Sequence, residues 1–373
     1  MKNAQLNSQD SIRLHVLASQ SQAIRLNESN MVVYGIQDGK QHSVQLRPTC
    51  KDEQYVKLVR ELLSSLVIDH PNGYPVFLGR WSRMGQLNSG RLSSLLRLAE
   101  PEAVVAVASS QNISAELAEL AWWANPNSEV ARFLLQSNDV AQSPIGLILA
   151  HFLLEYLPFE TDPENIAQTT FLVLHNGLLT EEQVSALWQR GNTKTSILLG
   201  FLRRGPTYLN RCNGEITSMR SQTFSNPQTH NIRPEDMVEW AVSIQGRSFF
   251  HTAMLILKQP ANPFIVTSVF EEISKAIGSI QKLEKMPESI TAIMQHLIAE
   301  QEIMNNCFQL ENKQLKEITY ALNFLALIGE SLLLKHFSRS TAVGSLMRKQ
   351  LQPVLCPVIE QLRIIYQYSE TRK

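Results

Sequence analysis

Two side chains in the middle of the sequence have a spacing that could hold a metal ion. His151 and Glu155 stand four residues apart inside an apolar run, so on a helix they would share one face. Two ligands do not complete a metal site, and the intervening Phe152 and Leu153 indicate a packed helix face instead. The sequence also lacks the motifs G-x-G-x-x-G, G-x-x-x-x-G-K-S/T, H-E-x-x-H and G-x-S-x-G. We therefore predict no catalytic residue, no metal and no cofactor.

Charged residues are sorted along the chain. Residues 70–99 hold four arginines and no acid. Residues 100–182 hold twelve acids and one base, Arg132, and residues 183–234 hold seven bases and one acid, Glu215. The formal net charge of the whole chain is zero, so any electrostatic attraction to a partner must be regional.

Arginine dominates the two basic zones, 80–97 and 190–233. Its planar guanidinium suits carboxylate or phosphate, which makes these side chains candidates for binding an anionic partner. The candidates are Arg80, Arg83, Arg91, Arg97, Arg203, Arg204 and Arg211. Two interpretations stay open, because the basic zones either neutralise the acidic middle of the same array or face an external protein or RNA.

Trp122 and Trp123 suggest base stacking at first sight. Adjacent residues on a helix point about 100° apart, so the two rings would not form one platform. We expect these rings to pack between helices.

Composition places the protein among soluble cytoplasmic chains. Hydrophobic residues make up 44% of the 373 residues, enough for packed cores, and the polar N-terminus lacks the apolar core of a signal peptide. The longest apolar runs fall short of the ~20 residues that a membrane span needs. The four widely spaced cysteines indicate small buried residues in a reducing compartment, and Cys212 is the best candidate for a reactive thiol.

Hydrophobic periodicity predicts a mainly α protein. We predict a small N-terminal α+β piece with a three-stranded antiparallel meander. It comprises helices over 8–20 and 51–67 and strands over 23–26, 31–36 and 42–46. Asp38-Gly39 marks the hairpin between the last two strands. We place this domain at residues 1–72.

Short helices with frequent caps follow. We predict an irregular HEAT-like helical array over 73–204, a long loop over 205–233 and a C-terminal helical bundle over 234–373. Helix starts are marked by Asp162-Pro163 and by the capping-box pattern that begins at Thr180. The bundle helices are expected over 234–246, 247–259, 263–282, 287–307, 311–337 and 340–368, with Pro353 and Pro357 kinking or breaking the last.

Several stretches of the sequence resemble the DsrS family, whose members are encoded beside the dissimilatory sulfite reductase genes of sulfur-oxidising bacteria. They include GYPVFLGRWSRMGQ, AELAWWANP and HFLLEYLPFE, and the full set covers residues 11–29, 50–62, 73–86, 95–108, 118–126 and 151–160. The resemblance implies a cytoplasmic accessory protein of sulfur oxidation that influences expression or assembly of that pathway. It carries over no catalytic residues.

We expect a non-catalytic regulatory protein that acts through protein–protein interaction at charged faces of its helical array. One alternative is an RNA-binding regulator that uses Arg80, Arg83, Arg203 and Arg204. A second is an enzyme with an unrecognised pocket at the seam between array and bundle. The identity of the partner and the oligomeric state do not follow from the sequence.

Overall fold

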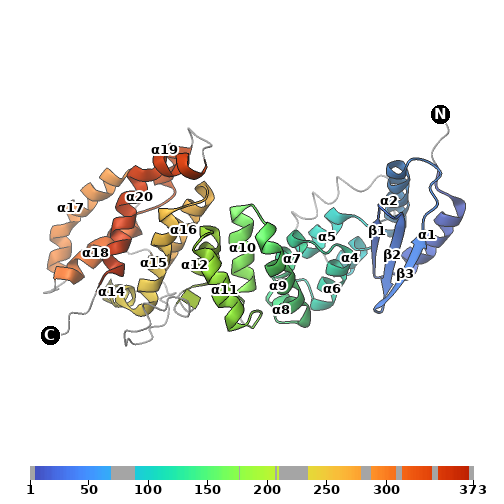
Figure 1. Cartoon of the computed structure of the whole chain (residues 1–373), viewed down its shortest axis with the longest axis horizontal. Coiled ribbons are helices and arrows are strands. Elements are labelled where there is room, and N and C mark those ends of the chain that lie inside the picture. Colours follow the sequence, from blue (N-terminus) through green and yellow to red (C-terminus); the bar gives the residue numbers. More distant parts are fainter. Residues whose placement is uncertain are drawn as a thin grey trace. The chain divides into compact units, whose positions relative to one another are not determined.

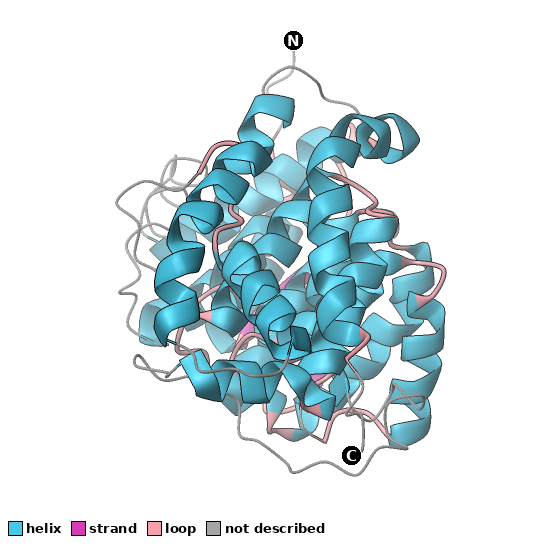
Figure 2. Ribbon diagram, turned by 90° about the vertical axis from the view of Figure 1, so that its left-hand side faces the viewer, coloured by secondary structure: helices cyan, strands magenta, loops and turns pink. Residues whose placement is uncertain are grey.

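The computed structural model describes residues 5–68, 89–175, 177–205, 208–209, 234–278, 287–307, 313–337 and 343–368. Within these residues the protein is mainly helical, with one small antiparallel sheet near the N-terminus, as the sequence predicts (Figure 2). The chain divides into two compact units, Met1–Pro158 and Phe159–Lys373. Each unit has its own packed core and is described by itself.

The first unit begins with an α+β piece. Its elements are α1 (Ser8–Gln20), β1 (Ala23–Asn27), β2 (Val32–Gln37), β3 (Lys40–Gln45) and α2 (Asp52–Ile68). The strands lie in the order β1-β2-β3, and all neighbours are antiparallel (Figure 1). Asp38 and Gly39 form the two-residue hairpin loop with φ angles of +47° and +76°, a conformation that Asp tolerates and Gly favours. The predicted meander is therefore confirmed.

The two faces of this sheet differ. Val33 pairs with Val44 in the sheet register, and Ile24, Val33 and Val44 are buried in one core with residues of α1 and α2. The opposite face carries Arg25, which pairs with Tyr34 in the sheet register. The free edge of β1 is partly satisfied by the backbone of Leu96, whose carbonyl accepts from the Ile24 amide at 2.9 Å.

Short helices complete the first unit. They are α4 (Ser89–Leu95), α5 (Pro101–Ala108), α6 (Ala115–Ala124), α7 (Ser128–Leu134), α8 (Asn138–Ala141) and α9 (Pro144–Tyr156). The side chains of Ser114 and Asn127 cap α6 and α7 by accepting backbone N–H groups. Trp122 of α6 packs edge-on against Phe152 of α9 with ring centres 4.8 Å apart, which is packing between helices as expected.

The second unit is helical throughout its described residues. Its helices are α10 (Pro163–Val173), α11 (Glu181–Gly191), α12 (Thr195–Arg204), α14 (Pro234–Val242), α15 (Ile244–Lys258), α16 (Pro263–Ile277), α17 (Ile290–Cys307), α18 (Lys313–Ala326), α19 (Ser331–Phe337) and α20 (Gly344–Tyr366). Asp162 caps α10, and Thr180 and Gln183 form the predicted capping box of α11. Helix α12 packs against α10 and α11 on the array side and against α15 and α16 on the bundle side.

Three details differ from the sequence expectations. The predicted helix over 311–337 is two helices, α18 and α19, because the chain turns at residues 327–330 while keeping Leu327 and Ile328 fully buried. Helix α20 continues through Pro353 and Pro357, so the expected break is absent and the expected kink stays a prediction. Cys356 is exposed and Cys50 is half-buried, so these two thiols are not the buried residues that we expected.

The unit boundary at residue 158 falls inside the predicted array 73–204, since α10, α11 and α12 belong to the second unit with the bundle. Periodicity shows where helices form but not which helices pack together. The predicted loop 205–233 lies almost wholly outside the described residues, and so does Cys212. No helix among the described residues is both long and apolar enough to cross a bilayer.

Candidate interaction surfaces

Helix α12 positions the most prominent pair of cationic side chains. Residues 196–202 of this helix are all buried, so its solvent-facing groups lie at the ends. The helix ends with Arg203 and Arg204, where positive charge is favoured by the helix dipole. Gly205 then terminates it with a φ of +101°, a value that other residues rarely adopt.

Both guanidinium groups are held against aromatic rings. The guanidinium carbon of Arg203 lies 5.4 Å from the ring centre of Phe264, and its Nη2 donates to Ser268 Oγ at 2.9 Å. The guanidinium carbon of Arg204 lies 5.3 Å from the Phe171 ring centre and 6.0 Å from that of Tyr208. Cation–π contacts of this kind orient a guanidinium without neutralising its charge.

Neither arginine forms an ion pair with a described residue. The ion pairs of the described chain involve other cations, such as Arg60 with Glu28 and Lys275 with Glu272. Both arginine side chains are also partly exposed. Among the described residues, therefore, no carboxylate pairs with Arg203 or Arg204.

The remaining candidate arginines are less informative. Arg80, Arg83 and Arg211 lie outside the described residues. Arg91 belongs to α4, but its side chain is also outside the described part. Arg97 is half-buried in the first unit, whereas Arg203 and Arg204 belong to the second. Among the candidates whose side chains are described, Arg203 and Arg204 are the two that the structure brings together.

The acidic middle of the sequence is a solvated surface. Ten of its twelve acids are exposed, and Glu100 and Glu160 are half-buried. Glu100 pairs with Arg60, whose Nε lies 3.2 Å from the carboxylate. Burial raises the pKa of Glu100 to about 7; Arg60 lowers it, but by less, and Glu102 and Glu28 raise it further.

The metal and enzyme alternatives depend on clustered ligands and on a pocket at the seam between array and bundle. Within the described residues, no three His, Cys, Asp or Glu side chains gather closely enough to hold a metal ion. His151 is exposed on α9. A cavity of about 170 Å³ lies where α12 meets α15, lined by residues such as Thr195 and Lys258, and it is smaller than the roughly 300–1,000 Å³ of ordinary ligand pockets.

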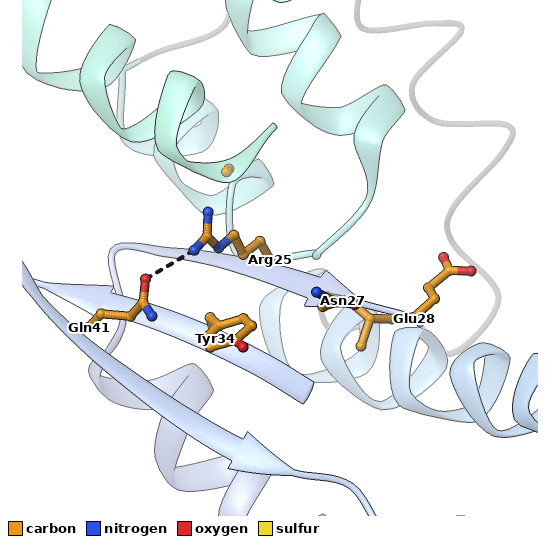
Figure 3. Close-up of a pocket in the computed structure, with 7 residues that line it drawn as sticks. Arg25, Asn27, Glu28, Tyr34 and Gln41 are labelled. Atoms are coloured by element: carbon orange, nitrogen blue, oxygen red, sulfur yellow. Dashed lines mark hydrogen bonds between the residues drawn. The ribbon is translucent and has the colours of Figure 1, made fainter. Parts of the chain in front are cut away.

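A second cationic feature, which the sequence analysis did not single out, lies on the outer face of the sheet. Arg25, Tyr34 and Gln41 line a pocket there with Asn27, Glu28 and the end of α6 (Figure 3). Arg25 is the lone base of its strand, so no charge cluster marks it in the sequence. Arg25 pairs with Tyr34 between β1 and β2, and its contact with α6 is a long-range contact that no local pattern reveals.

The fold and these surfaces define a mainly helical protein with a solvated acidic surface, a small polar pocket and an arginine doublet that has no ion pair among the described residues. No family model, curated protein or solved structure matches the chain.

Proposed function

We propose that this chain is a non-catalytic accessory protein that docks an acidic segment of a partner protein on Arg203 and Arg204. The observation that carries the proposal is the state of these two side chains. They are adjacent, partly exposed, held on aromatic rings and without an ion pair among the described residues. A guanidinium that is already oriented loses little conformational freedom when it binds a carboxylate edge-on.

Local charge favours an acidic peptide over RNA. Residues 159–209, which include the arginine doublet, contain five acids and four bases, so the described part of the chain around the doublet supplies few further cations. Glu181 and Glu182 are exposed at the start of α11, which packs against α12. An RNA strand draws most of its affinity from repeated phosphate contacts, and these described neighbours supply few cations for them. A short peptide with one or two carboxylates needs only the two guanidinium groups.

The resemblance to DsrS supports a place for this partner in dissimilatory sulfur oxidation, in the cytoplasm. In this proposal the chain influences the pathway by binding one of its proteins. The alternative of an RNA-binding regulator remains as an outcome of the test below.

The proposal is tested by affinity capture with the tagged full-length chain from extract of sulfur-oxidising cells. The wild-type chain should recover at least one pathway protein at low salt and release it at high salt. The double variant Arg203→Gln/Arg204→Gln should recover little of that protein. Arg190→Gln is the matched control, because Arg190 is exposed on neighbouring α11 and should leave recovery unchanged.

Two results would overturn the proposal. One is equal recovery of every partner by the wild-type chain and the double variant. The other is recovery of RNA as the component that depends on Arg203 and Arg204, which would favour the regulatory RNA-binding alternative. Circular dichroism of each variant confirms that the helices are intact.

A further inference from the structure

The outer face of the N-terminal sheet has the composition of a binding surface. Strand register places Arg25 beside Tyr34, and Ser43 follows on the next strand. These residues point away from the apolar core, which takes the alternate residues of each strand. The end of α6 reaches this face, because Trp123 contacts Arg25 there.

A pocket of about 480 Å³ opens on this face. Its polar lining comes from Arg25, Asn27, Tyr34 and Gln41 of the three strands and from Glu28, which follows β1 (Figure 3). This volume lies within the roughly 300–1,000 Å³ range of small-molecule sites. The pocket is therefore large enough for a small metabolite, and its lining residues belong to the first unit, whereas Arg203 and Arg204 belong to the second.

Arg25 is the charged group of this pocket whose hydrogen-bonding capacity is least satisfied. Its guanidinium carbon lies 4.7 Å from the ring centre of Trp123 and 5.1 Å from that of Tyr34. Its Nη2 donates to Gln41 Oε1 at 3.1 Å, and its Nη1 donates to the Trp123 carbonyl at 3.4 Å. A guanidinium has five N–H donors, so these two contacts leave donor capacity. No described carboxylate forms an ion pair with it.

Glu28 lines the same pocket but does not neutralise Arg25. Its Oε1 accepts from Arg60 Nη2 at 2.6 Å. Figure 3 shows the Glu28 side chain extending away from that of Arg25. Glu28 is thus paired with Arg60, and the pocket keeps one cation, Arg25, that has no ion-pair partner among the described residues.

We propose that this pocket binds a small organic acid, with its carboxylate against the exposed edge of Arg25. The guanidinium keeps N–H donors that its contacts with Gln41 and Trp123 do not use, and a planar carboxylate fits such a fork. One cation matches one carboxylate charge, whereas phosphate sites usually combine several donors or a helix N-terminus. Asn27, Gln41 and the Tyr34 hydroxyl are neutral groups suited to a hydroxyl or carbonyl on the body of the ligand.

Isothermal titration of the full-length chain tests this proposal with acetate, lactate, malate and benzoate, and with inorganic phosphate, at matched ionic strength. At least one carboxylate should bind saturably with one site per chain and more tightly than phosphate. Arg25→Lys keeps the charge but removes the planar fork, and it should weaken binding about tenfold or more. Gln41→Ala alters an exposed side chain and should weaken binding several-fold.

Arg13→Ala is the control, since Arg13 is an exposed arginine of α1 outside the pocket and its loss should not change the affinity. A purely structural Arg25 that only joins the sheet to α6 would give no saturable carboxylate binding, and that result overturns the proposal. Equal affinity in the wild-type chain, Arg25→Lys and Gln41→Ala overturns it as well. Tighter binding of phosphate than of every carboxylate would refute the assignment of the ligand class.

Discussion

At the scale of single residues, Glu100 links burial to pH. Its side chain is 11% exposed, and Ala99 before it adopts a φ of +56°. Arg60 is its ion-pair partner but is shared with Glu28. Desolvation of the carboxylate outweighs this shared cation, and so the pKa of Glu100 rises to about 7.

A raised pKa makes Glu100 a pH-dependent source of stability. The protonated form of Glu100 contributes to the free energy of unfolding. This contribution is fully present below the unfolded pKa of 4.5 and is lost as pH rises through about 7. We expect Glu100→Gln to raise the free energy of unfolding at pH 8 by about 1–3 kcal/mol and to flatten its pH dependence between these values. Urea unfolding at a series of pH values measures this. Unchanged pH dependence in the variant would contradict the assignment.

Tyr55 and Asp10 form a buried polar pair in the first unit. Both side chains are fully buried, and the Tyr55 hydroxyl donates to Asp10 Oδ2 at 2.5 Å. Burial, reinforced by the Asp10 hydrogen bond, raises the pKa of Tyr55 to about 12, so the phenol remains a donor across the accessible pH range. The amide of Arg47 is the other donor to the same oxygen, at 2.7 Å.

Removal of the Tyr55 hydroxyl should leave a buried carboxylate with one fewer donor. We expect Tyr55→Phe to lower the free energy of unfolding by about 1–3 kcal/mol. Tyr320→Phe is the matched control, because the hydroxyl of Tyr320 makes no hydrogen bond within the described residues. Equal denaturant midpoints for both variants would show that the Asp10 contact contributes little.

At the scale of elements, the sequence located most helices because caps and periodicity are local. The Asp38-Gly39 hairpin and the Thr180 capping box are encoded within a few residues and formed as predicted. The split of 311–337 into α18 and α19 was not predicted, since the turn keeps apolar Leu327 and Ile328 in the core. An apolar run that stays buried through a turn looks like a continuous helix in a periodicity pattern.

Close packing of α10 on α12 depends on a glycine. A Cβ at Gly200 would lie 2.4 Å from Thr170 Cβ and 2.8 Å from the Ala167 carbonyl oxygen. We expect Gly200→Ala to lower the free energy of unfolding by about 1–3 kcal/mol, because the two helices must separate to accept it. Gly191→Ala is a milder comparison in the same unit, since its nearest neighbour is the flexible end of Leu198 at 2.5 Å. Thermal melts of both variants test the difference, and a larger loss for Gly191→Ala would refute this account of the packing.

At the scale of the whole molecule, charge order along the sequence anticipated part of the candidate site. Arg203 and Arg204 were two of the seven candidate arginines, and both lie in the last turn of α12. Their aromatic partners Phe171 and Phe264 come from other helices, so only the folded chain shows how the guanidinium groups are held. Arg25 was missed for the same reason, because Trp123 lies 98 residues away along the chain.

The division into units was also beyond the sequence pattern. The repeated short helices of residues 73–204 suggested one array, yet α10 to α12 share a unit with the bundle. Side-chain packing between distant helices decides such boundaries, and helical periodicity does not record it.

The most direct test of the central claim is the affinity of the full-length chain for a labelled glutamate-rich peptide of about twelve residues, measured by fluorescence anisotropy. Two carboxylate contacts to oriented guanidinium groups, at about 1 kcal/mol each, imply that Arg203→Gln/Arg204→Gln weakens binding about tenfold or more. Arg190→Gln should bind as the wild-type chain does, and high salt should weaken the wild-type affinity. Identical affinities for the wild-type chain and the double variant, or tighter binding of an RNA of the same length, would contradict a protein-docking role for the arginine doublet.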